Sequence, residues 1–166
     1  MQRLILLRHG KTEAVSASGA DIDRALTARG HDDAALMGRV LASAGVAPNL
    51  VLVSSALRAS ETWAGLAPSF PLAEVRIEPA IYLASVERLA GLIDDQQKAT
   101  SLMVVGHNPG LHELAAIRST RGQAADRERL IQGFPTAAAA ILAQTAGGDW
   151  TLERLLTPRD FRGDPG

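Results

Sequence analysis

An arginine and a histidine, Arg8 and His9, stand directly behind the apolar run of residues 4–7 near the start of the chain. A guanidinium offers a planar pair of N–H groups to two oxygens of a phosphoryl group, and a neutral imidazole nitrogen can attack phosphorus as a nucleophile. Ligands bind at the carboxyl ends of the strands in open α/β sheets. A buried strand that ends in these two residues would therefore present both of them to a phosphorylated ligand.

Two further apolar runs lead to the same residue types. The run at residues 50–54 is followed by Arg58, in the first turn of an expected helix, where backbone N–H groups also attract anions. The run at residues 101–106 is followed at once by His107. Two arginines and two histidines are therefore predicted to meet at one edge of a sheet and to form a phosphate pocket.

Helical segments separate the strands that must position these residues. Strands are expected over residues 3–7, 50–54 and 101–106. Apolar residues recur at spacings of three and four within residues 27–44, as on one face of a helix. Ser55 is placed to cap a second helix over residues 56–66, and Ser85 to cap a third. Strands that alternate with helices predict an α/β fold with a largely parallel sheet.

The end of the chain has the pattern of a β-hairpin followed by a tail. Residues 137–144 and 150–156 are apolar segments that flank a glycine-rich turn at residues 147–149. The last nine residues contain two prolines and two glycines. We expect a single domain over residues 1–157 and a surface tail over residues 158–166.

Composition excludes several classes of protein. The chain has 166 residues, of which 46% are hydrophobic and 21% charged, as in an ordinary globular domain. Its net charge of -1, with both signs mixed along the sequence, gives no basic surface for nucleic acid or for an anionic membrane. The absence of cysteine excludes disulfides and thiolate chemistry. No apolar run reaches the roughly 18 residues of a membrane span, so we expect a cytoplasmic protein that has neither nucleic acid nor membrane as a partner.

The four histidines do not have the spacing of a metal site. His107 and His112 are five residues apart, which does not place them on one face of a helix, and no His-x-x-His pair occurs. His31 and His112 are expected at the surface or within helices. We predict no metal and no cofactor.

Four motifs follow one another along the chain. They are LRHG at residues 7–10, RALTARG at 24–30, SSALRASET at 54–62 and VGHNPGL at 105–111. In type and order they resemble the histidine phosphatase superfamily, and they are most similar to its SixA-like phosphohistidine phosphatase group. The resemblance implies a phosphoglycerate mutase-like fold, a three-layer α/β/α sandwich around a mostly parallel sheet. It also implies that His9 is the nucleophile and forms a phosphohistidine intermediate, while Arg8, Arg58 and His107 hold the phosphoryl oxygens.

These roles set the protonation states that we expect for the two histidines. His9 must be neutral with one ring nitrogen free, so a carbonyl should accept a hydrogen bond from the other nitrogen and fix the tautomer. His107 should work protonated, because a bound phosphate dianion raises the pKa of a neighbouring imidazole.

A carboxylic acid that would protonate an alkoxide leaving group has no clear match in the motifs. Members of the superfamily that hydrolyse ordinary phosphate esters carry such an acid. Glu78 stands in the part of the chain where it often lies, and the other candidates are Asp21, Asp23, Glu87 and Glu113.

The lack of a clear leaving-group acid indicates which substrate to expect. Imidazole leaves a phosphoramidate more readily than an alkoxide leaves an ester, and help from a general acid is worth roughly 10²- to 10⁴-fold. We therefore expect a metal-independent phosphatase that dephosphorylates phosphohistidine in a protein domain, in a signalling role. One alternative is a small-molecule phosphomonoesterase or phosphoglycerate mutase-like enzyme that acts on a small phosphate ester. The other is a non-catalytic phosphate-binding module.

Overall fold

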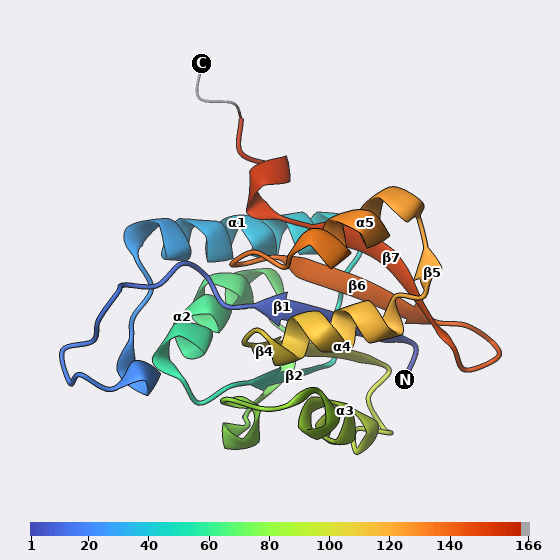
Figure 1. Cartoon of the computed structure of the whole chain (residues 1–166), viewed down its shortest axis with the longest axis horizontal. Helices are drawn as coiled ribbons and strands as arrows, with labels where there is room; N and C mark the ends of the chain where they lie inside the picture. Colours follow the sequence, from blue (N-terminus) through green and yellow to red (C-terminus); the bar gives the residue numbers. More distant parts are fainter. Residues whose placement is uncertain (164–166) are drawn as a thin grey trace.

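Within residues 1–163, which the computed structural model describes, a seven-stranded sheet runs through the centre of the molecule with helices on both faces (Figure 1). The strands are β1 (Arg3–Arg8), β2 (Leu50–Val53), β3 (Glu74–Ile77), β4 (Ser101–Gly106), β5 (Arg121–Gly122), β6 (Ala139–Gln144) and β7 (Trp150–Leu156), in the spatial order β3-β2-β4-β1-β6-β7-β5. The helices are α1 (Ala28–Ser43), α2 (Leu57–Leu66), α3 (Val86–Asp94), α4 (Gly110–Arg118) and α5 (Ala124–Gln132). None of these helices is long and apolar enough to cross a membrane.

The two faces of the sheet bury alternate residues of the same strands. In β1, Leu4 and Leu6 belong to the core beneath α3, α4 and α5, whereas Ile5 and Leu7 belong to the core beneath α1 and α2. A strand that is covered on both sides needs apolar residues at every position, which explains the unbroken apolar runs in the sequence. This three-layer α/β/α arrangement around a mostly parallel sheet confirms the predicted fold class.

The strand pairing brings three carboxyl ends to one edge of the sheet. β4 pairs in parallel with β1 on one side and with β2 on the other. The register sets Arg8 opposite Gly106, and Val53 opposite Val105. The residues that follow β1, β2 and β4 are therefore neighbours at this edge, as the sequence predicts. β6 is antiparallel to β1 and to β7, with which it forms the predicted hairpin.

The predicted helix caps are confirmed at one serine and wrong at the other. The Ser85 side chain accepts a hydrogen bond of 3.3 Å from the backbone N–H of Arg88 at the start of α3. Ser55 caps nothing, because α2 begins one residue later than expected and its N-cap residue, Ala56, has no side chain that could cap it. The Oγ of Ser54, which lies at the end of the β2 run, accepts the Ala56 N–H at 3.3 Å instead.

Part of the predicted surface tail packs against the domain. Pro158–Asp160 forms a 3-10 helix in which Thr157 and Asp160 make a capping box, and Pro158 is buried. The Arg162 guanidinium forms a hydrogen-bonded ion pair with the buried carboxylate of Asp33 in α1. Residues 164–166 of the predicted tail lie outside the residues that the structure describes.

Candidate active site

The imidazole of His9 is held with one nitrogen engaged and the other free. His9 follows β1 and only 8% of it is exposed. Its Nδ1 lies 2.7 Å from the carbonyl oxygen of Gly10. A carbonyl oxygen can only accept, so Nδ1 carries the hydrogen and donates it, and Nε2 retains its lone pair. The expectation that a carbonyl fixes the tautomer of His9 is confirmed.

The surroundings of His9 keep its imidazole neutral. Its pKa is lowered to about 4, mainly by burial and in part by the nearby cations Arg58 and Arg8, while the hydrogen bond to the Gly10 carbonyl acts in the opposite direction. At neutral pH the ring is therefore the uncharged form that can attack phosphorus.

The loop that carries His9 is held in place by contacts of Gly10 with α1 and α2. The Gly10 N–H donates to Thr62 Oγ1 at 2.9 Å, and that hydroxyl donates to the Arg58 carbonyl at 2.6 Å. A Cβ on Gly10 would lie 2.8 Å from the carbonyl oxygen of Gly30, so the loop and the first turn of α1 approach too closely for a side chain at position 10. These contacts tie the end of β1 to the starts of both α1 and α2.

Arg8 has one nitrogen anchored and another without a partner. Its Nη1 donates to the carbonyl of Phe134 at 3.0 Å, and the Asn108 side chain donates to the same oxygen at 2.9 Å. Its buried Nε has no hydrogen-bond partner among residues 1–163. A buried guanidinium N–H with this geometry can donate to an anion that enters the site.

His107 faces His9 across the site, with 5.2 Å between the two ring centroids. Its Nε2 lies 2.7 Å from the Oγ of Ser54. Since Ser54 already accepts the Ala56 N–H, its own hydroxyl hydrogen is available to donate to Nε2. The other nitrogen, Nδ1, is buried without a partner among the described residues. A neutral His107 can therefore donate its Nδ1–H to a phosphoryl oxygen.

The protein groups around His107 act against the charged state that the sequence analysis expected. Its pKa is lowered to about 3, mainly by burial and in part by the neighbouring His9 and Arg58, while Asp21 acts in the opposite direction. The expected rise in pKa would have to come entirely from a bound dianion. When the Ser54 hydroxyl donates to Nε2, the neutral ring carries its hydrogen on Nδ1. His107 can then donate to a phosphoryl oxygen without being protonated.

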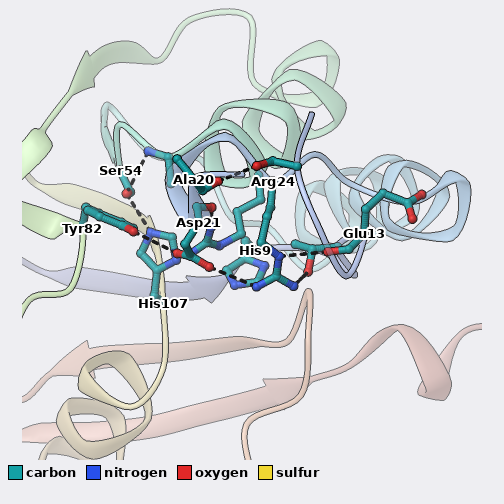
Figure 2. A network of polar contacts seen from close by, with 12 residues as sticks. His9, Glu13, Ala20, Asp21, Arg24, Ser54, Tyr82 and His107 are labelled. Carbon is teal, nitrogen blue, oxygen red and sulfur yellow. Dashed lines mark hydrogen bonds and ion pairs between the residues drawn. The ribbon is translucent and has the colours of Figure 1, made fainter. Parts of the chain in front are cut away.

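Asp21 accepts hydrogen bonds from two of the donor groups of Arg58, and Figure 2 shows Asp21 within the network of polar contacts that also contains Tyr82 and Arg24. Arg58 is 6% exposed, and it donates through Nη1 to the Asp21 carbonyl at 2.8 Å and through Nη2 to Oδ2 at 3.0 Å. Tyr82 donates its hydroxyl to Oδ2 at 2.9 Å, and Arg24 donates to Oδ1 at 3.1 Å. The Asp21 carboxylate thus lies at the guanidinium to which a phosphoryl group is expected to bind.

The same contacts determine the ionisation of Asp21. Hydrogen bonds from Tyr82, Arg24 and Arg58 lower its pKa to about 2, against the opposing effect of burial. Asp21 is one of the five carboxyl groups considered above as a leaving-group acid. Since it is ionised at neutral pH, it carries no proton to donate.

Glu78 has a local structural role. Its Oε1 accepts the backbone N–H of Ala80 at 2.9 Å, as the N-cap of a 3-10 helix over Pro79–Ile81. Within residues 1–163 Glu78 has no hydrogen bond to any of the four predicted pocket residues. Separately, no group of three metal-ligating side chains in this part of the chain is close enough together to hold a metal ion. The structure thus brings Asp21, and not Glu78, to the predicted phosphate ligand Arg58.

Several residues of the site were missed by sequence reasoning. They are Ser54, which holds His107; Thr62, which holds Gly10; Arg24 and Tyr82, which hold Asp21; and Phe134, whose carbonyl holds Arg8. Ser54, Thr62 and Arg24 lie within the recognised motifs, so their polar side chains were the available signal. Tyr82 and Phe134 stand outside them and contact the site only through the tertiary fold.

The arrangement as a whole suits the transfer of a phosphoryl group. The free Nε2 of His9 can attack, while Nε of Arg8, Nδ1 of His107 and the guanidinium of Arg58 are the donors near it. Such donors stabilise the charge that develops on phosphoryl oxygens during in-line displacement.

Comparisons with known proteins agree with this interpretation. The model of the histidine phosphatase superfamily (branch 1) matches residues 4–100. A chloroplastic protein of Arabidopsis thaliana is 31% identical over 170 residues, which cover 95% of this chain and 78% of the relative. The crystal structure of a candidate phosphohistidine phosphatase SixA from Agrobacterium tumefaciens superposes with a TM-score of 0.84 and 29% identity, covering 95% of this chain and 98% of the other. A candidate alpha-ribazole-5'-P phosphatase from Escherichia coli shares the fold, with a TM-score of 0.71 and 21% identity over 95% of this chain and 98% of the other. Together they support a phosphatase.

Proposed function

Because this chain belongs to the histidine phosphatase superfamily, we propose that it removes the phosphoryl group from phosphohistidine in a protein, with His9 as the nucleophile. A small phosphate ester is the alternative substrate. The superfamily and the SixA-like fold support phosphatase activity, and the substrate is inferred from the chemistry of the site.

The proposed reaction has two displacements at phosphorus. In the first, Nε2 of His9 forms a bond to phosphorus as the bond from phosphorus to the substrate ring breaks. The electron pair of that bond stays on the substrate ring, which carries a proton on its other nitrogen and therefore leaves as neutral imidazole. In the second, water attacks the phosphorylated His9 and releases inorganic phosphate, which restores the neutral ring. Arg8, Arg58 and His107 donate hydrogen bonds to the non-bridging oxygens in both steps.

The observation that carries the choice of substrate is the set of hydrogen bonds that the Asp21 carboxylate accepts from Tyr82, Arg24 and Arg58. This carboxylate lies at Arg58, with its pKa lowered to about 2 by hydrogen bonds from Tyr82, Arg24 and Arg58. It cannot protonate an alkoxide at neutral pH, so a leaving group that departs without strong acid assistance is favoured. An imidazole is such a leaving group, and an alkoxide is not.

The test compares leaving groups at one active site. We expect the wild type to hydrolyse a phosphohistidine peptide and activated aryl phosphates, with kcat/KM falling steeply as the leaving group becomes more basic, and alkyl phosphates to react at least about 100-fold more slowly. The same series measured with Asp21→Asn separates the roles of this carboxylate. Alkyl phosphates that react as fast as phosphohistidine, and that lose this rate selectively in Asp21→Asn, would establish the small-ester alternative instead.

A further inference from the structure

Two adjoining hollows lie where α1 meets the segment that follows β7. Their volumes are about 980 and 500 Å³, and their shared lining includes Arg29, Asp33, Arg159 and Arg162. We call them together the arginine groove. Its charged lining consists of five arginines and three aspartates, which are Arg29, Arg39, Arg129, Arg159, Arg162, Asp32, Asp33 and Asp160. The groove thus has a charge of +2, whereas the whole chain has a net charge of -1.

Two of the three carboxylates of the groove form ion pairs with arginines of the groove itself. Asp33 is buried and paired with Arg162, with a second guanidinium, that of Arg29, at 3.9 Å. Asp160 is paired with Arg129 at 2.8 Å. The third carboxylate, Asp32, is exposed and forms no ion pair within residues 1–163, so two unpaired arginines face one unpaired aspartate and the groove keeps an excess of positive charge.

Two guanidinium groups of the groove are open to a partner. Arg39 and Arg159 are both exposed, and neither forms an ion pair within residues 1–163. Arginine binds carboxylates through two parallel N–H groups and is less strongly hydrated than lysine, so it is well suited to contact an acidic surface. These two side chains are the ones that a docked anion would meet first.

The groove begins next to the candidate active site. Thr136 lines it, and the next residue, Ala137, donates its N–H to the carbonyl of His9 at 2.9 Å. Arg29 also lines it, and the adjacent Gly30 packs against Gly10. Neither hollow is lined by His9 itself, so the groove adjoins the site without being part of it.

The length of the groove indicates a chain rather than a small ion. Arg39 lies ten residues beyond Arg29 on α1, which corresponds to about 15 Å along the helix axis. An extended peptide covers this length with about five residues. A single phosphate would contact only a small part of a groove whose cations are spread over this distance.

We propose that the arginine groove binds an acidic segment that flanks the phosphorylated histidine of the protein substrate. This inference rests on the proposed function, because it assigns the groove to the same phosphoprotein that reacts at His9. Charge complementarity of this kind raises the rate of encounter and selects the partner. The groove would therefore distinguish acidic phosphoproteins from basic ones and from small phosphate esters.

The experiment uses three phosphohistidine peptides that differ only in the roughly ten residues on each side of the phosphohistidine, which are glutamate, glutamine or lysine and are long enough to leave the active site and cover the groove. The enzymes are the wild type, the double variant Arg39→Glu/Arg159→Glu and the control Arg121→Glu. Arg121 is exposed in β5 and pairs with Thr151 at the start of β7, at the opposite edge of the sheet from the candidate active site. p-Nitrophenyl phosphate serves as a small substrate that does not reach the groove.

We expect wild-type kcat/KM to be about tenfold higher for the glutamate peptide than for the lysine peptide, as a few exposed ion pairs would give. The double variant should lose or reverse this preference, and the preference should shrink in roughly 0.5 M salt. Both variants should hydrolyse p-nitrophenyl phosphate at the wild-type rate, which also shows that they are folded. Arg121→Glu should retain the wild-type preference.

Two different failures can be told apart. Equal kcat/KM for the three peptides would overturn the proposal that the groove binds an acidic segment, and so would the same preference in the double variant as in the wild type. In both cases the proposed function stands. Turnover of p-nitrophenyl phosphate without turnover of any phosphohistidine peptide would overturn the proposed function and the inference that rests on it.

Discussion

Acidification to pH 5 should destabilise the native protein by about 2 kcal/mol through His9 alone. The pKa of His9 is lowered by burial to about 4 in the folded chain, compared with 6.5 for an ordinary histidine. At pH 5 the unfolded chain therefore binds a proton at this residue almost completely, while the folded chain binds little. Because the folded pKa is the lower one, the stability is fully present above pH 6.5 and is lost as the pH falls through about 4.

Urea unfolding at pH 7 and at pH 5, for the wild type and for His9→Gln, measures this contribution. The decrease in the free energy of unfolding between the two pH values should be about 2 kcal/mol smaller in the variant, because glutamine does not titrate. His107 has its pKa lowered by burial and by His9, so the single variant His107→Gln and the double variant complete the cycle. Equal decreases for the wild type and for all three variants would refute the buried, neutral imidazole on which the mechanism depends.

Three further predictions concern packing, charge and cofactors. Gly30→Ala should destabilise the fold by about 1–3 kcal/mol in urea unfolding, because its Cβ would clash with the Lys11 carbonyl oxygen. Gly91→Ala, with open space around position 91, should not destabilise the fold. Asp21→Asn should bind inorganic phosphate roughly tenfold more tightly as a competitive inhibitor. Asp21 is half-exposed, and for an assumed separation of about 5 Å its carboxylate costs about 0.8 kcal/mol per unit charge of the anion, which for phosphate is about 1.5 to 2. Weaker inhibition would mean that Asp21 assists binding. Activity should be unaffected by EDTA, and a loss that zinc or magnesium reverses would contradict metal independence.

The positions of the four predicted site residues followed from the order of the strands. Parallel strands bring their carboxyl ends to one edge, so the residues behind β1, β2 and β4 had to be neighbours. His9 and His107 are 98 residues apart in the sequence, and their rings lie 5.2 Å apart. This part of the site depends on backbone topology, which the apolar runs and helical periods encode directly.

The contact of Asp21 with Arg58 could not be predicted in the same way. Asp21 begins a three-residue 3-10 helix, Asp21–Asp23, in the connection before α1, and its partners Arg58 and Tyr82 are 37 and 61 residues away in the sequence. So short a helix within a connection leaves no periodic signal, and the sequence therefore favoured Glu78 over Asp21 as the carboxyl group of the site until the fold placed both residues.

Two strands and the packing of the tail were missed for related reasons. β3 is an exposed edge strand, and β5 has only two residues, so neither has the apolar run that marks a buried strand. Arg162 lies in a segment rich in proline and glycine, and only its pairing with the buried Asp33 shows that it packs against α1.

The most direct test of the central claim is to trap the phosphorylated enzyme. Brief reaction with a radiolabelled phosphohistidine peptide, followed by rapid denaturation and peptide mapping, identifies the residue that carries the phosphoryl group. The mechanism predicts an acid-labile, alkali-stable phosphate on Nε2 of His9, and neither label nor turnover in His9→Gln. Label on a different residue, or wild-type turnover by His9→Gln, would contradict it.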